Sequence, residues 1–106
     1  MAFGISKQEL ALWKEAVREG RLAFLTHYWY DERFPDHDTV TKVSCHSEEV
    51  LAKWGNLHGL EDRWIDRRKD GYPHFDLLGN FQKDILQKEF EIDSPQLGVL
   101  VKRINL

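Results

Sequence analysis

Residues 22–30 (LAFLTHYWY) constrain the fold of this chain more than any other segment. Apolar side chains occupy both odd and even positions at the start of the segment, and aromatic side chains follow. Successive side chains of a strand point to opposite faces of a sheet, so a strand that is apolar at both parities is covered on both faces. We therefore expect a strand here, in a sheet that packs against other elements on each side.

Three segments carry the signals of helices. Ser6 and Glu9 have the spacing of a capping box and begin a helix that ends at Gly20. Ser47, followed by two acids, begins a second helix, and Asn80 is expected to cap a third. The residues expected to face the core from the second and third helices are Val50, Leu51, Trp54, Leu57, His58, Phe81, Ile85, Leu86 and Phe90.

Three further segments are expected to be strands: residues 39–45, which are rich in β-branched side chains, residues 72–78 and residues 97–104. The resulting order α-β-β-α-β-α-β contains two βαβ units, which need parallel pairing and right-handed crossovers. We therefore predict an α/β fold with a mixed sheet of about four strands and three helices packed on it. Residues 1–106 would form a single small domain, with residues 91–106 as a C-terminal strand or tail.

The composition argues against several classes of function. The formal net charge of -3 in 106 residues argues against a protein that coats extended nucleic acid. No apolar run approaches the roughly 18 residues that a membrane helix needs, and the first residues lack the pattern of a secretory signal peptide. The one cysteine, Cys45, cannot form an internal disulfide. We therefore expect a cytoplasmic protein that binds neither membranes nor extended nucleic acid.

Histidine and carboxylate side chains are concentrated at two places along the chain. Strand alternation places His27 and Asp31 on one face of the first strand, and His74 shares a face of a later strand with Asp76. Such groups exchange protons near neutral pH, so His74, Asp76 and Asp31 are the catalytic candidates, and His37 is a further polar group. No pair has a recognised metal spacing such as HExxH, so we expect no metal ion and no cofactor. A network of hydrogen bonds without a ligand is the structural alternative.

A basic cluster begins with Arg63 and Arg67 and continues with Arg68 and Lys69. A guanidinium group binds a phosphate or a carboxylate through two parallel hydrogen bonds, so the cluster suits an anionic ligand. Acidic residues interleave with the cluster, however, and a solvated loop with balanced charges is an alternative that stays open.

Aromatic side chains can stack on a nucleobase, and Trp29 or Tyr30 is the candidate for such a ligand contact. Trp13 and Trp54 lie on helix faces and are expected to be core residues. Cys45 lies in an apolar-flanked strand and is expected to be a buried thiol rather than a nucleophile. The chain has no P-loop, GxGxxG or GxSxG motif, so NTPase, dinucleotide oxidoreductase and α/β-hydrolase activities lack support.

Three motifs match a known pattern: DERFP at residues 31–35, LHGL at residues 57–60 and YPHFDL at residues 72–77. Through these motifs the chain resembles a family of small bacterial and phage proteins of unknown function, the YneQ-like proteins, over roughly residues 1–90. The resemblance implies no activity, and residues 91–106 depart from the pattern. The residues that occupy its motif positions are Asp31, Arg33, Pro35, His74 and Asp76.

These features predict a non-enzymatic protein that holds a small anionic ligand, phosphate-containing or nucleotide-derived, in a polar and aromatic pocket. The expected ligand-binding residues are His27, Trp29, Asp31, Arg33, His37, Arg63, Arg67, His74 and Asp76. Because the resemblance reaches phage proteins, sequestration of a nucleotide-derived signal of host defence is one concrete version of this function. A homo-oligomer would add walls to the pocket at subunit interfaces.

Two alternatives stay open. An enzyme, a hydrolase or transferase acting on a nucleotide-like substrate, would use His74 as general acid or base, oriented by Asp76 or Asp31. A protein–protein interaction module would instead expose its aromatic side chains as an apolar patch without a concave site.

Overall fold

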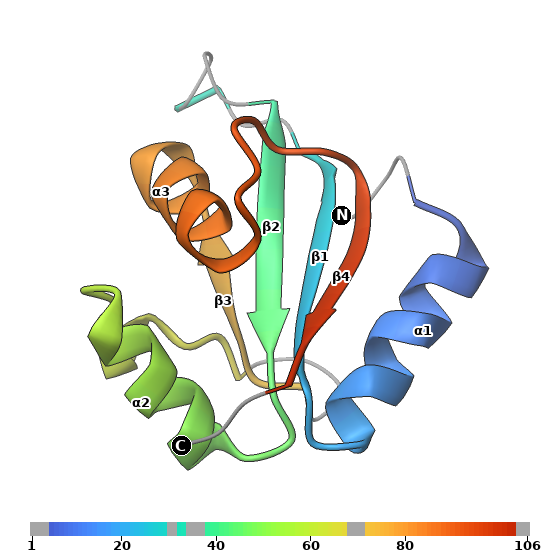
Figure 1. Ribbon diagram of the computed structural model, residues 1–106, viewed down its shortest axis with the longest axis vertical. Helices are drawn as coiled ribbons and strands as arrows, with labels where there is room; N and C mark the ends of the chain where they lie inside the picture. The colour runs from blue at the N-terminus through green and yellow to red at the C-terminus, as the bar shows by residue number, and fades with distance from the viewer. Residues whose placement is uncertain (1–4, 30–31, 34–37, 68–71, 104–106) are drawn as a thin grey trace.

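A computed structural model describes residues 5–29, 32–33, 38–67 and 72–103 of the 106-residue chain. These residues form an α/β fold, in which three helices pack on a four-stranded sheet (Figure 1). Each helix and strand expected from the sequence is present. The elements in chain order are α1 (Lys7–Arg18), β1 (Leu22–Tyr28), β2 (Thr39–Ser44), α2 (Glu48–Leu57), the short 3-10 helix η1 (Asp62–Trp64), β3 (His74–Leu77), α3 (Gly79–Phe90) and β4 (Gly98–Lys102).

The four strands lie in the order β3-β2-β1-β4, and each neighbouring pair is antiparallel. The prediction of a mixed sheet with parallel pairs is therefore wrong. A helix between two strands gives parallel pairing only when it carries the chain back to the end of the sheet where the first strand began. Here Ser44, the last residue of β2, pairs with His74, the first residue of β3. The segment through α2 and η1 thus returns the chain to the end where β2 finished.

The helices lie on both faces of the sheet (Figure 1). On one face, Ala23 and Leu25 of β1 pack with Trp13 of α1, whose indole Nε1 donates a hydrogen bond of 3.0 Å to the carbonyl of Ala23. On the other face, Leu22 and Phe24 of β1 belong to the core formed with α2 and α3. The expectation that this strand is covered on both faces is confirmed.

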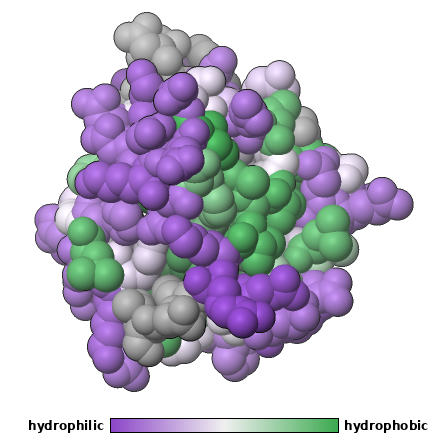
Figure 2. Space-filling model, in the orientation of Figure 1, coloured by the Kyte–Doolittle hydropathy of each residue, from purple (hydrophilic) through white to green (hydrophobic). Residues whose placement is uncertain are grey.

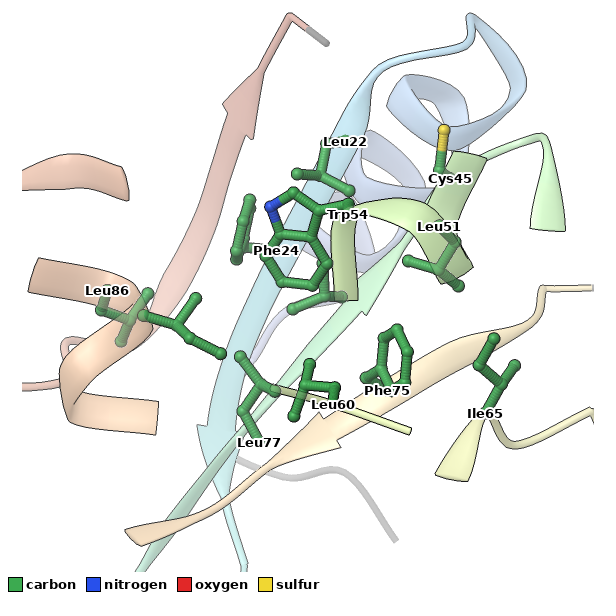
Figure 3. Packing of buried hydrophobic residues seen from close by; sticks show 12 residues of the cluster. Leu22, Phe24, Cys45, Leu51, Trp54, Leu60, Ile65, Phe75, Leu77 and Leu86 are labelled. Carbon is green, nitrogen blue, oxygen red and sulfur yellow. The ribbon is translucent and has the colours of Figure 1, made fainter. Parts of the chain in front are cut away.

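Three aromatic rings form the centre of the larger core (Figure 3). The ring centroids of Phe24 and Trp54 lie 5.7 Å apart in an edge-to-face arrangement, and those of Trp54 and Phe75 lie 6.2 Å apart. Gly55 of α2 permits this packing, because a Cβ atom at Gly55 would lie 2.5 Å from Cζ of Phe75. The expectation that Trp54 is a core residue is confirmed.

The two serine caps expected from the sequence are confirmed. The amide of Glu9 donates to Oγ of Ser6 at 3.1 Å, and the amide of Ser6 donates to Oε1 of Glu9 at 3.0 Å, which completes the capping box. The amide of Val50 donates to Oγ of Ser47 at 3.2 Å, which caps α2. Local hydrogen bonding therefore fixes where these two helices begin.

Other helix predictions are wrong in detail. The cap residue of α3 is Leu78, so Asn80 lies within the first turn of the helix rather than at its cap. Phe81, expected to face the core, is 42% exposed, and Leu57, at the end of α2, is 73% exposed. Helical periodicity assigns a residue to a face, but the core does not extend to the ends of these helices.

Figure 2 shows an apolar area over β4, between α1 and α3, on a surface that is otherwise largely hydrophilic in this view. Val99 and Val101 of β4 are half-buried, and they line a groove with Leu12 of α1. Among the helices of the described residues, none is long and apolar enough to cross a membrane.

Candidate functional site

Polar side chains of three strands gather on the face of the sheet that α1 partly covers. The strand register places Lys42 of β2 opposite Leu25 of β1 and opposite Asp76 of β3, so Lys42 and Asp76 share the face of Leu25. Side-chain alternation then adds His27 and His74 to the same face. Strand alternation in the sequence had already predicted that His74 and Asp76 lie together, and the register adds Lys42.

His74 lies at the centre of this group and is only 7% exposed. Its ring Nδ1 lies 3.0 Å from the carbonyl oxygen of Tyr72. A carbonyl oxygen only accepts hydrogen bonds, so Nδ1 carries the proton and donates it. In the neutral ring, the lone pair therefore resides on Nε2, which lies 3.6 Å from Oδ2 of Asp76 and 3.9 Å from Oδ2 of Asp66.

Asp66 is a member of this group that the sequence interpretation missed. Its amide donates to the carbonyl of His74 at 2.8 Å, and the amide of His74 donates to the carbonyl of Asp66 at 3.1 Å. The segment after η1 therefore lies along the outer edge of β3. The preceding residue, Ile65, is buried in the core, so alternation turns the side chain of Asp66 to the opposite side.

The charges around His74 favour its protonated form. Burial lowers the pKa of His74, but the Asp76 carboxylate and the Tyr72 carbonyl outweigh burial, and the net pKa is raised above its ordinary value of 6.5. The positive charge of Lys42 opposes this shift. The Asp76 carboxylate and the Tyr72 carbonyl thus stabilise a positive charge on the His74 ring.

In His27, burial outweighs the groups that raise the pKa. The ring is 1% exposed, and Nδ1 donates to the backbone carbonyl of Tyr28 at 2.8 Å. Burial lowers the pKa of His27, the hydrogen bond to Tyr28 raises it, and the charge of Lys42 lowers it, so the net pKa is lowered. Nε2 is buried and has no hydrogen-bond partner among the described residues. His27 is therefore a neutral, buried group of the sheet.

A hollow of about 500 Å³ opens beside the two carboxylates. Both Asp66 and Asp76 line it, and His74 contacts both of these side chains. The lining residues are Arg63, Trp64, Ile65, Asp66, Arg67 and Asp76. Three residues that the sequence analysis selected as ligand contacts, from two separate segments, thus come together in one concave site.

The two arginines of the hollow already have acidic partners. Nε of Arg63 donates to Oε1 of Glu61 at 2.8 Å, and Nε of Arg67 donates to Oε1 of Glu48 at 2.7 Å. The hydrogen bond between these two side chains, Arg63 and Glu61, lowers the pKa of Glu61 and raises the pKa of Arg63. Both pairs are exposed, so solvent screens them. The alternative of a loop balanced by its own acids therefore holds for Arg63, whereas the partner of Arg67 lies on α2, and both arginines also line the hollow.

The remaining candidates from the sequence do not line this hollow or lie outside the described residues. Trp29 is half-buried after β1, and its amide donates to the carbonyl of Asp38 at 2.9 Å. Arg33 is exposed. Neither residue is among those that line the hollow. Asp31 and His37, together with the motif residue Pro35, lie outside the described residues.

Among the described residues, one group of side chains has the composition and spacing of a metal-binding site. Asp66, His74 and Asp76 each offer one ligand atom, and these three atoms lie within 4.8 Å of one another. One imidazole nitrogen and two carboxylate oxygens are ligands that zinc and related divalent ions accept.

Comparison with curated proteins finds one relative, the uncharacterized protein YneQ of Bacillus subtilis (strain 168). The two sequences are 52% identical over 89 residues, which cover 84% of this chain and 89% of YneQ. No family model matches the sequence. No solved structure matches it either.

Proposed function

The chain belongs to the family of the uncharacterized protein YneQ, and we propose that it binds a small phosphate-containing ligand in the hollow beside β3. The observation that carries this proposal is the hollow itself, which has a volume of about 500 Å³ and is lined by two arginines and a tryptophan among other residues. Sites for small molecules in proteins have volumes of about 300–1,000 Å³ and a few convergent polar groups.

Arg63 and Arg67 would hold the phosphate. A guanidinium group presents a planar set of donors that matches two oxygens of a phosphate. The present partners of both arginines are glutamates in exposed ion pairs, which contribute little because water competes for the charges. A ligand phosphate carries more charge than a carboxylate, so it can replace Glu61 and Glu48 as the partner.

Trp64 would stack on an aromatic part of the ligand. Among phosphate-containing molecules, a nucleotide has both a phosphate and such an aromatic ring. The side chain of Trp64 lines the hollow and is 42% exposed. The ring of Phe81 packs edge-on against the indole, with 5.8 Å between the ring centroids. This contact helps to fix the orientation of the indole. Stacking of a nucleobase on an aromatic side chain contributes about 1–3 kcal/mol in nucleic-acid systems.

A hydrolase or transferase that acts on the same ligand is the second candidate. The specific observation in its favour is the buried His74 ring beside Asp76, with a raised pKa that keeps a proton available near neutral pH. We place either activity in the cytoplasm, where the single thiol, the buried Cys45, stays reduced.

The test is isothermal titration of the protein with inorganic phosphate, pyrophosphate and ADP, followed by analysis of the recovered ligand. We expect saturable binding, weakened about tenfold or more by Arg63→Gln or Arg67→Gln. The matched control is Arg21→Gln. Arg21 makes a similar exposed pair, with 2.6 Å between its Nη2 and Oε1 of Glu19, and this pair does not line the hollow beside β3. Absence of binding, or equal weakening by Arg21→Gln, would contradict the proposal. Recovery of a hydrolysed product would establish the enzyme instead of the binder.

A further inference from the structure

We propose that Asp66, His74 and Asp76 bind a divalent transition-metal ion, such as Zn²⁺ or Mn²⁺, at the edge of the hollow. The sequence analysis expected no metal ion, because Asp66 is separated from the other two residues along the chain and forms no recognised spacing with them. The backbone pairing of Asp66 with His74 removes that separation in space.

The orientation of the His74 ring is the first argument. Histidines that bind metal ions commonly donate one ring N–H to a carbonyl or carboxylate, which leaves the other nitrogen free for the ion. In His74 the Tyr72 carbonyl accepts from Nδ1, and Nε2 points towards Asp66 and Asp76. The ring is buried and held in place, so its orientation exists before any ion binds.

The distances between the ligand atoms are the second argument. Nε2 lies 3.6 Å and 3.9 Å from the two carboxylate oxygens, which is too long for a hydrogen bond. Two ligands that each lie about 2.1 Å from a tetrahedral zinc ion are about 3.4 Å apart. The two distances from Nε2 are therefore close to those between ligands of one ion, and the three ligand atoms, which lie within 4.8 Å of one another, would move closer together when the Asp66 and Asp76 side chains turn towards the ion.

The rigidity of the backbone is the third argument. Two hydrogen bonds join Asp66 to His74, and Asp76 follows His74 by two residues on the same strand and the same face. The side chains of His74 and Asp66 are 9% and 19% exposed, whereas that of Asp76 is 41% exposed. The cluster is thus closed towards the sheet and open towards the hollow, which leaves a coordination position for water or a ligand atom.

A bound ion would change the charge of the hollow and so favour binding of the proposed phosphate ligand. This inference rests on the proposed function. Among the lining residues, the charges of Arg63 and Arg67 are balanced by those of Asp66 and Asp76. These four side chains together carry no net charge, so a bound cation would strengthen the attraction of the hollow for a phosphate that the arginines hold. A divalent ion on the two carboxylates would raise the charge of the hollow by two, and its open coordination position would accept a phosphate oxygen.

The experiment is titration of the EDTA-treated, dialysed full chain with ZnCl₂ and MnCl₂, measured by calorimetry. The expected result is binding of one ion per chain, weakened about tenfold or more by Asp66→Asn or Asp76→Asn. Asparagine has nearly the same shape as aspartate, so these variants test the charge rather than the packing. Asp84→Asn, at an exposed position of α3, is the control and is expected to bind as the wild type does.

A second readout identifies the ligands. Co²⁺ bound by one imidazole nitrogen and carboxylate oxygens gives a visible spectrum, which we expect for the wild type and for Asp84→Asn but not for Asp76→Asn. Lack of ion binding by the wild type, or equal binding by Asp76→Asn, would overturn the metal site.

The two proposals can fail separately. Binding of ADP that is equal with and without EDTA, in a protein that binds no ion, would overturn the metal site and leave the proposed function intact. Binding of the ion without any binding of phosphate, pyrophosphate or ADP would support the metal site and overturn the proposed function. Binding of ADP that requires the ion would support both.

Discussion

The carboxylate of Glu89 on α3 accepts a hydrogen bond of 3.0 Å from the indole Nε1 of Trp54 on α2. The same carboxylate lies 2.8 Å from Nε2 of His58 and 2.6 Å from Nζ of Lys102 on β4. The side chain of Glu89 is 13% exposed, so these contacts replace most of its hydration. One carboxylate on α3 therefore connects α2 and β4, on the face of the sheet opposite the proposed site.

Glu89→Gln is expected to destabilise the protein by about 1–3 kcal/mol, because a buried hydrogen-bonded charge is removed and its donors lose part of their partner. The free energy of unfolding, measured with urea, tests this. Glu49→Gln is the matched control, since Glu49 makes an exposed contact of 3.5 Å with Lys53 on α2. A cost for Glu89→Gln no greater than that of the control would show that the network contributes little.

The pKa of Glu89 predicts how stability depends on pH. Burial raises this pKa, but the hydrogen bonds from Lys102, Trp54 and His58 lower it by a larger amount. The net pKa is therefore below its ordinary value of 4.5. A carboxyl group with a lower pKa in the folded state stabilises the fold above its unfolded-state pKa, and this contribution is lost as the pH falls through the folded-state pKa.

We therefore expect the free energy of unfolding to decrease as the pH falls below about 5. Glu89→Gln is expected to show a smaller decrease over the same range, because glutamine does not titrate. Urea denaturation of both proteins at several pH values provides the measurement. Identical acid-induced losses would mean that Glu89 does not carry the effect.

Gly55→Ala is expected to destabilise the core by about 1–3 kcal/mol, because the new methyl group would overlap the ring of Phe75. The same substitution in a Phe75→Leu background is expected to cost less, since leucine leaves room for the methyl group. A double-mutant cycle measures this coupling. If Gly55→Ala destabilises both backgrounds equally, its effect does not come from overlap with the Phe75 ring.

Trp64→Ala is expected to weaken ADP binding by about 1–3 kcal/mol, because the stacking surface is lost. The effect on the free energy of unfolding is expected to stay below about 1 kcal/mol, since the side chain is 42% exposed. Trp64→Phe retains an aromatic ring and is expected to restore most of the affinity. Unchanged ADP affinity in Trp64→Ala would remove the indole from the binding site.

Much of the fold could be predicted because its signals are local. Ser6 and Glu9 determine the start of α1 through bonds across three residues, and Ser47 does the same for α2. The direction of strand pairing was not predictable in this way. It depends on where α2 and η1 bring the chain before β3, which is decided by packing across the sheet. The exposure of Leu57 likewise depends on which elements reach the end of its helix.

The candidate site, like the fold, could be predicted from the sequence only in part. His74 and Asp76 are two residues apart on a strand, so alternation alone predicts that they share a face. Asp66 joins them only through backbone pairing with His74, for which the sequence contains no local signal. Arg63 and Arg67 were predicted as ligand contacts, and the structure adds that both line one hollow with Asp76. The expectation of a homo-oligomer stays a prediction.

The most direct test of the proposed site is to map backbone amide chemical shifts by NMR while ADP is added to the protein in the presence of Zn²⁺. The account predicts the largest shift changes in residues 63–67 and 74–76, which form the hollow and the ion-binding cluster, and small changes in α1 and β4. Changes that concentrate along α1 and β4, or no changes at saturating ADP, would contradict a ligand site beside β3.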